Sequence, residues 1–147
     1  MNAFSLAFVP AAVCVALLFT APTAAGADKE DLQGVWVATS MEINGELAPA
    51  KEVERTRFTF KGEKLLVRHA KDEGKEEKAT FKADPKKSPR HLDITLRNKT
   101  LHGIYEVKGD ELKFCFETGD KPENRPTKFA TNKEEELVLI VFKRQKP

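Results

Sequence analysis

The chain has 147 residues with 25 basic and 23 acidic side chains, so its formal net charge is only +2. The two signs alternate along the chain, as in residues 71–78, which read KDEGKEEK. A nucleic-acid interface needs clustered positive charge without carboxylates in between. The composition therefore predicts that nucleic acid is not a partner.

The N-terminal segment has the composition of a signal peptide. No charged side chain precedes Asp28, residues 3–19 form an apolar run, and residues 24–27 read AAGA. A small-residue site after an apolar run is typical of cleavage during secretion. We therefore predict a signal peptide over 1–27 and one exported domain over 28–147, periplasmic, envelope-associated or extracellular, with no stable membrane insertion after cleavage. An uncleaved N-terminal anchor is the alternative, since about 20 apolar residues can span a bilayer.

Strand signals then recur at short intervals, separated by turn residues. Asn44-Gly45 predicts a tight type I′ hairpin turn, and residues 50–54 allow one helical turn. Residues 83–90 and 118–126 are predicted loops. The predicted strands cover residues 34–43, 55–61, 64–70, 76–82, 91–97, 101–107, 111–117, 127–131 and 136–143.

Alternation within these segments predicts the fold class. Phe58 and Phe60 share one strand face, while Arg57 and Thr59 occupy the other, which indicates antiparallel strands with one buried and one solvated side. Closing the sheet removes exposed edges. We predict an all-β, antiparallel up-and-down barrel of eight to nine strands. The last strand is apolar on both faces over 137–142, so both faces should be covered.

Several segments together resemble a known family. They are residues 32–36 (LQGVW), 101–105 (LHGIY), 112–116 (LKFCF), 125–129 (RPTKF) and 141–144 (VFKR). From Leu32 to Arg144 the chain resembles a family of uncharacterised small secreted domains, numerous in planctomycete bacteria and lipocalin-like (calycin-type) in fold. The resemblance implies an exported β-barrel. It implies no activity, because a fold by itself does not determine function.

The wider lipocalin resemblance concerns one end of the barrel. Lipocalins place a Gly-x-Trp motif on the first strand at the closed end, and an arginine near the last strand packs across the indole. Gly34 and Trp36 match the motif, and Arg144 is the candidate arginine. This resemblance implies a structural role in barrel closure for all three residues. Plain core packing of Trp36 is the alternative.

Catalytic signatures are missing from the sequence. Neither Ser40 nor Ser88 lies in a Gly-x-Ser-x-Gly elbow. Cys115 alternates with phenylalanines, which favours a small covered residue over a nucleophile. No short-spaced ligand pair marks a zinc site among the three histidines, His69, His91 and His102. We predict that the protein is not an enzyme and has no catalytic residues, no metal and no cofactor.

Two functions fit the predicted barrel. The first is a non-enzymatic binding module that holds a small apolar or amphipathic ligand, with Tyr105 as a polar group in the site. Arg125 is predicted at the barrel rim, where it could bind a carboxylate of the ligand. The alternative for Arg125 is an ion pair with carboxylates of its own loop. The alternative function is a solid barrel, filled by the same side chains, that binds another protein or an envelope polymer. The predicted inner wall consists of Phe58, Phe60, Leu65, Val67, Phe81, Ile94, Leu96, Phe114 and Phe116.

Overall fold

The computed structural model describes residues 29–69 and 73–146, and the predicted signal peptide lies outside these ranges. One helix, α2 (Ala50–Arg55), confirms the predicted helical turn, and η2 (Pro122–Asn124) is a short 3-10 helix. No helix in the described ranges has the length and apolar character needed to cross a bilayer. The strands are β1 (Gly34–Ile43), β2 (Glu46–Leu47), β3 (Arg57–Lys61), β4 (Lys64–Arg68), β5 (Glu76–Asp84), β6 (Arg90–Leu96), β7 (Lys99–Lys108), β8 (Glu111–Glu117) and β9 (Leu137–Gln145).

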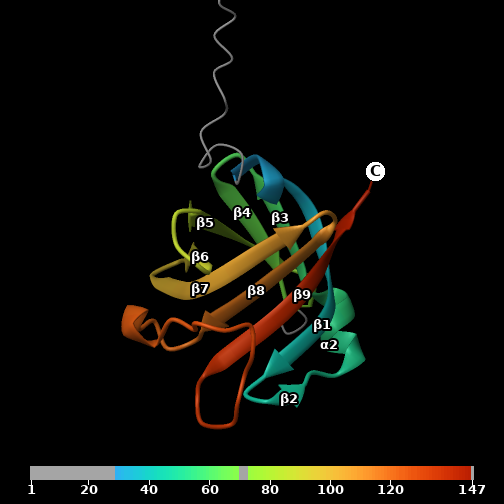
Figure 1. Ribbon diagram of the computed structural model, residues 1–147. Coiled ribbons are helices and arrows are strands. Elements are labelled where there is room, and N and C mark those ends of the chain that lie inside the picture. The colour runs from blue at the N-terminus through green and yellow to red at the C-terminus, as the bar shows by residue number, and fades with distance from the viewer. Residues whose placement is uncertain (1–28, 70–72, 147) are drawn as a thin grey trace, which may run out of the picture.

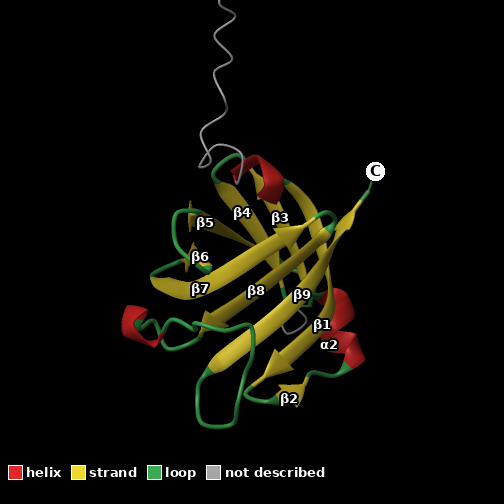
Figure 2. Ribbon diagram, in the orientation of Figure 1, coloured by secondary structure: helices red, strands yellow, loops and turns green. Residues whose placement is uncertain are grey.

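These strands close into an antiparallel barrel (Figures 1 and 2). From β3 to β9 each strand pairs with the next along the chain, β1 pairs with β3, and β9 returns to pair with β1. Eight strands thus form the closed barrel, while β2 is an extra strand on β1. The predicted all-β up-and-down barrel is confirmed.

One predicted strand is wrong. Residues 127–131 form bends and coil, and the two-residue β2 is present instead. The reason is the register of the barrel, because β8 and β9 pair directly from Glu117–Leu137 to Glu111–Lys143. The intervening segment 118–136 is therefore excluded from the sheet. It lies outside the barrel and contributes no strand to the sheet.

The β1–β2 hairpin forms as its turn residues predict. Asn44 and Gly45 have φ angles of 50° and 81°, and Ile43 pairs with Glu46 across them. Two consecutive positive φ angles define a type I′ turn, which Asn-Gly adopts readily. This hairpin lies at the lower end of the barrel in Figure 1, opposite the helical turn formed by residues 29–32.

A β-bulge in β1 changes which residues face the interior. Ala38 pairs with Phe142 and Ser40 with Val141, so Thr39 is the extra residue between them. An extra residue shifts the side-chain alternation by one position. After Thr39, Met41 therefore points inward, where an uninterrupted alternation would have placed Ser40.

Aromatic side chains fill one half of the barrel. The Phe58 ring is 3% exposed and its centroid lies 4.7 Å from that of Phe142 and 6.3 Å from those of Phe60 and Phe114. Phe114 stacks on Phe116 at 4.8 Å. Tilted and offset contacts of this kind stabilise aromatic pairs beyond their area of burial. This half of the barrel is a packed core.

Trp36 and Arg144 close the end of this packed half. The Arg144 guanidinium carbon lies 4.2 Å from the Trp36 ring centroid, and its Nη2 donates to the Asp31 carbonyl at 2.7 Å. Nη1 donates to the Gln33 carbonyl, and Trp36 Nε1 donates to the Leu32 carbonyl at 2.8 Å. The Asp31 and Leu32 carbonyls end the helical turn over 29–32, where helix geometry leaves them without partners, and Gln33 directly follows the turn. The two side chains thus anchor the chain as it enters the barrel.

Segment 118–136 covers part of the outer wall. Ile104 and Cys115 point away from the core, yet both are 0% exposed, and Leu137 is 5% exposed. The Cys115 thiol lies 3.7 Å from the Ala130 carbonyl of this segment. Coverage of β9 on both faces, expected from its sequence, is confirmed at Leu137.

Candidate ligand cavity

A cavity of about 310 Å³ occupies the barrel half opposite Trp36. It lies where β1, β6 and β8 end and β7 begins, which is the end of the barrel that carries the β1–β2 hairpin. Its lining residues are Met41, Ile43, Glu52, Thr56, Phe58, Val67, His69, Ile94, Leu96, Lys99, Leu101, Phe116, Thr118, Val138 and Ile140.

The inner part of the cavity is apolar. Phe58 forms its floor, because this ring contacts both the cavity and the aromatic core below. Ile94 is 0% exposed, Ile140 is 2% exposed and Val138 is 8% exposed. A site with such walls binds aliphatic or aromatic groups by removing apolar surface from water.

Polar side chains gather where the cavity opens. Glu52 comes from α2, His69 directly follows β4, Lys99 begins β7 and Thr118 follows β8. Because these residues come from four separate parts of the chain, barrel closure alone brings them together. The arrangement offers a ligand both charged and neutral hydrogen-bonding groups at the entrance.

Thr56 fixes α2 beside this entrance. Its hydroxyl donates to the Glu52 carbonyl at 2.8 Å, and its carbonyl accepts from the Ala38 amide at 3.0 Å. Val53 packs its buried side chain into the core from the same helix. A helix of six residues is too short to be stable alone, and these contacts with β1 hold it in place.

Five of the predicted inner-wall residues line the cavity, and the rest do not. Phe60, Leu65 and Phe114 are buried in the packed half, Phe81 is half-buried against Phe60, and Tyr105 is 1% exposed in the core. The structure thus divides the predicted wall into core and cavity. The residues that line the cavity are Phe58, Val67, Ile94, Leu96 and Phe116.

Sequence reasoning missed three groups of lining residues. Met41 and Ile43 face inward only because of the bulge at Thr39. Val138 and Ile140 belong to a strand that is apolar on both faces, so alternation gave no signal for its inner side. The polar residues at the entrance, Glu52, His69 and Lys99, come from three separate parts of the chain, and no sequence pattern marks a shared site.

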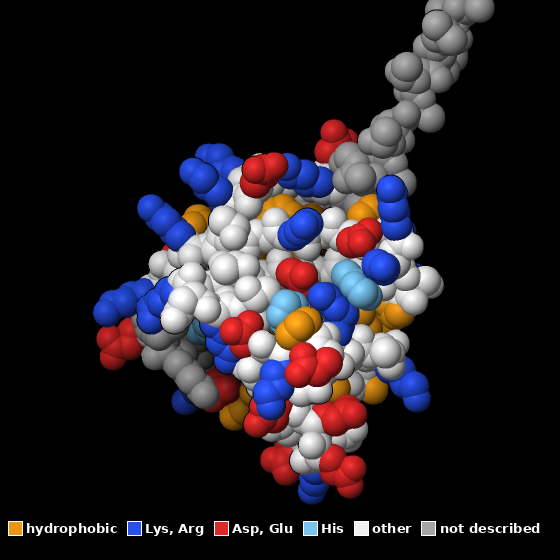
Figure 3. All heavy atoms as spheres, turned by 90° about the vertical axis from the view of Figure 1, so that its left-hand side faces the viewer, with side chains coloured by type: hydrophobic (Ala, Val, Ile, Leu, Met, Phe, Trp, Pro, Cys, Tyr) orange, Lys and Arg blue, Asp and Glu red, His pale blue; other side chains and the backbone are white. Residues whose placement is uncertain are grey.

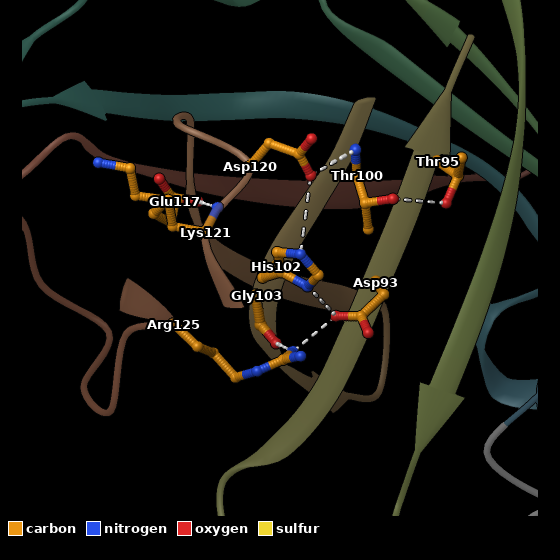
Figure 4. Close-up of polar contacts among 9 residues, drawn as sticks. All are labelled: Asp93, Thr95, Thr100, His102, Gly103, Glu117, Asp120, Lys121 and Arg125. Atoms are coloured by element: carbon orange, nitrogen blue, oxygen red, sulfur yellow. Dashed lines mark hydrogen bonds and ion pairs between the residues drawn. The ribbon is translucent and has the colours of Figure 1, made fainter. Parts of the chain in front are cut away.

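Arg125 does not reach the cavity, and its predicted position at the rim is wrong. Its Nη1 lies 2.7 Å from Asp93 Oδ1 and donates to the Gly103 carbonyl at 2.8 Å, on the outer face of β6 and β7 (Figure 4). The alternative prediction, that Arg125 pairs with a carboxylate of the protein, is correct, but the partner is Asp93 on β6 and not a loop carboxylate. Segment 118–136 carries Arg125 outward because it leaves the barrel after Glu117.

His102 extends this outer polar cluster. Its Nδ1 lies 3.4 Å from Asp93 and its Nε2 lies 3.8 Å from Asp120, whose carboxylate also accepts from the Thr100 amide at 3.1 Å (Figure 4). Asp120 belongs to segment 118–136 and His102 to β7. The cluster therefore fastens the segment to the barrel wall.

Glu117 fastens the first residues of the same segment. It is 2% exposed, and its carboxylate accepts from the backbone amides of Gly119 and Lys121, the latter at 2.9 Å. A buried carboxylate requires such partners, since an unsatisfied one is costly. The hydrogen bonds from these two loop amides thus explain how the Glu117 carboxylate can be buried.

The face of the molecule on the left-hand side of Figure 1 shows no dominant sign of charge. Figure 3 shows basic and acidic side chains intermixed over the face that it presents. In the described residues, no group of three or more His, Cys, Asp or Glu side chains could hold a metal ion. Comparisons with protein-family models, curated proteins and solved structures find no match to this chain.

Proposed function

We propose that this protein is a non-enzymatic module that binds one small apolar or amphipathic ligand inside its barrel. The cavity of about 310 Å³ carries this proposal. Its volume is at the lower end of the roughly 300–1,000 Å³ typical of ligand sites, and an eight-stranded barrel can enclose one small ligand.

The chemistry of Cys115 supports a non-enzymatic role. The pKa of this thiol is raised to about 11, chiefly by burial; the contact with the Ala130 carbonyl lowers it, and the Glu42 and Glu135 carboxylates add to the rise. A thiol must ionise to act as a nucleophile. At neutral pH this side chain is protonated and covered by segment 118–136.

Export and family membership belong to the same proposal. The uncharged segment before Asp28 supports secretion through a signal peptide. The stacking of Arg144 on Trp36, with Gly34 two residues before the indole, supports a calycin-type barrel. Such a protein would carry its ligand in the periplasm, in the envelope or outside the cell.

An interaction domain without a small ligand is the second candidate. Leu47 is 77% exposed and Ile43 is 36% exposed, both on the β1–β2 hairpin, and they are the only exposed large apolar side chains in the described part of the chain. A partner bound at this hairpin would cover apolar surface that is otherwise exposed to water. This function predicts that the cavity stays empty of any cargo.

Two valine substitutions on β9 distinguish these functions. Val138 faces the cavity, whereas Val141 faces outward on the same strand. We expect a neutral fluorescent naphthylamine dye to bind the protein with a Kd near 1 μM, about −8 kcal/mol. Val138→Phe should weaken binding at least tenfold by filling the cavity, and Val141→Phe should leave it unchanged.

The measurement is a fluorescence titration, with a urea melt to establish that each variant is folded. Equal binding by both variants would place the dye outside the barrel. Folded protein that binds no apolar dye would contradict the ligand-binding proposal and favour the interaction domain.

A further inference from the structure

Lys99 lies at the edge of the apolar cavity. It is exposed at the start of β7 and lines the cavity beside Leu96 and Leu101. Arg125 and Arg144, by contrast, have carboxylate neighbours in Asp93 and Asp110. Within the described residues Lys99 forms no ion pair, so its ammonium group is available to a ligand.

His69 stands at the same entrance and has no ion-pair partner in the described residues either. It follows the last residue of β4, and its side chain is half-buried. An imidazole can donate a hydrogen bond to an oxyanion in both its neutral and its charged form. The entrance therefore offers an ammonium group and a second hydrogen-bond donor.

We propose that the ligand is an amphipathic monoanion whose acidic head group binds Lys99 and His69 and whose aliphatic chain extends toward Phe58. This inference rests on the proposed function and adds the chemical class of the ligand. A head group at the entrance keeps contact with water, which avoids the cost of burying a charge. The chain gains the apolar contacts of the inner wall.

Glu52 is the one carboxylate among the lining residues, and it favours a positively charged head group on the ligand. It lies on α2, whereas Lys99 and His69 lie on the barrel itself. Two donors against one acceptor favour an acidic head group over an ammonium. The experiment must therefore compare an acidic ligand directly with an ammonium ligand, and the proposal requires the acidic one to bind more tightly.

The cavity volume limits the length of the chain. At roughly 30 Å³ for a group the size of a water molecule, about 310 Å³ holds on the order of ten such groups. The aromatic core below Phe58 blocks a deeper path. The structure thus fits a chain of about ten carbons better than one of sixteen.

Isothermal titration calorimetry with three ten-carbon probes, decanoate, decanol and decylammonium, tests the head group. We expect decanoate to bind about fivefold more tightly than decanol, the upper range for a solvent-exposed ion pair. Lys99→Gln should lower the affinity for decanoate and so reduce this difference at least twofold. Lys143→Gln, at the closed end where Lys143 pairs with Val37, should preserve it.

The outcomes separate this inference from the proposed function. Equal affinities for decanoate and decanol, or tighter binding of decylammonium, would overturn the acidic head group while leaving a ligand-binding barrel. Hexadecanoate binding more tightly than decanoate would overturn the chain length. If folded protein bound none of the probes, the proposed function itself would fail.

Discussion

The guanidinium of Arg144 lies over the indole of Trp36, with 4.2 Å between its central carbon and the ring centroid. The two residues are neighbours across the β1–β9 pairing that closes the barrel. Arg144 also donates to the Asp31 and Gln33 carbonyls, so it joins the last strand to the segment that precedes the first. One side chain thus combines cation–π attraction, barrel closure and the satisfaction of helix-end carbonyls.

This relationship predicts that Arg144→Lys lowers the free energy of unfolding by about 1–2 kcal/mol. Lysine keeps the charge but lacks the planar fork that reaches two carbonyls while lying flat on a ring. Urea denaturation measures the loss. Lys146→Gln is the control, because Lys146 also pairs with Asp110 but is 75% exposed, and we expect it to change stability by less than about 1 kcal/mol.

Trp36→Ala should cost about 3–5 kcal/mol, the range for emptying a large aromatic site in a core. The indole is 0% exposed and its Nε1 is hydrogen-bonded. A urea melt that shows a loss below about 1 kcal/mol would mean that the ring is not part of the packed end.

Gly103→Ala should destabilise the barrel by about 1–3 kcal/mol through overpacking. A Cβ at this position would lie 2.4 Å from Phe114 Cε2, 2.6 Å from the Cys115 carbonyl oxygen and 2.9 Å from Phe116 Cβ. A double-mutant cycle with Phe114→Leu checks the cause, since the smaller side chain should reduce the cost of the added methyl. Additive effects of the two substitutions would exclude the Phe114 ring as the source of the clash.

Arg125→Ala should loosen segment 118–136 without changing ligand binding. Arg125 holds Asp93 and the Gly103 carbonyl on the outer wall, and the cavity lies on the other side of the sheet. Limited proteolysis should cut the variant faster within 118–136, and Lys121→Ala should behave like the wild type because its side chain is exposed. Weakened dye binding by Arg125→Ala would place this residue back in the site.

Cys115 should resist thiol reagents at pH 8 in the folded protein and react fully in urea. Burial raises its pKa to about 11, whereas an exposed thiol ionises near pH 8.5. The unfolded state therefore releases its proton first, so this group lowers stability as the pH rises above about 8.5. Cys115→Ala should reduce that alkaline loss, measured by urea melts from pH 7 to 10.

Secretion should remove residues 1–27. The small residues before Asp28 predict cleavage after Ala27. N-terminal sequencing of the exported protein should therefore begin at Asp28, and a sequence that begins at Met1 would favour the membrane anchor.

The sequence by itself determined the barrel and one of its turns. Alternation of apolar and polar residues assigns each strand a buried and a solvated face, which depends only on local backbone geometry. The Asn44-Gly45 pair likewise specifies a hairpin turn through the φ angles that these two residues tolerate. Because the connections between successive strands are short, each strand lies beside the next, and a sheet of this order closes into an up-and-down barrel.

Only the tertiary structure decided what the barrel encloses. Whether Phe58 and its neighbours fill the interior or leave a cavity depends on strand stagger and ring packing, which no local pattern encodes. The bulge at Thr39 turns Met41 inward because the long β1–β9 pairing accommodates one extra residue. Arg125 lies outside because β8 and β9 pair directly and exclude the segment between them, a choice made by contacts distant in the sequence.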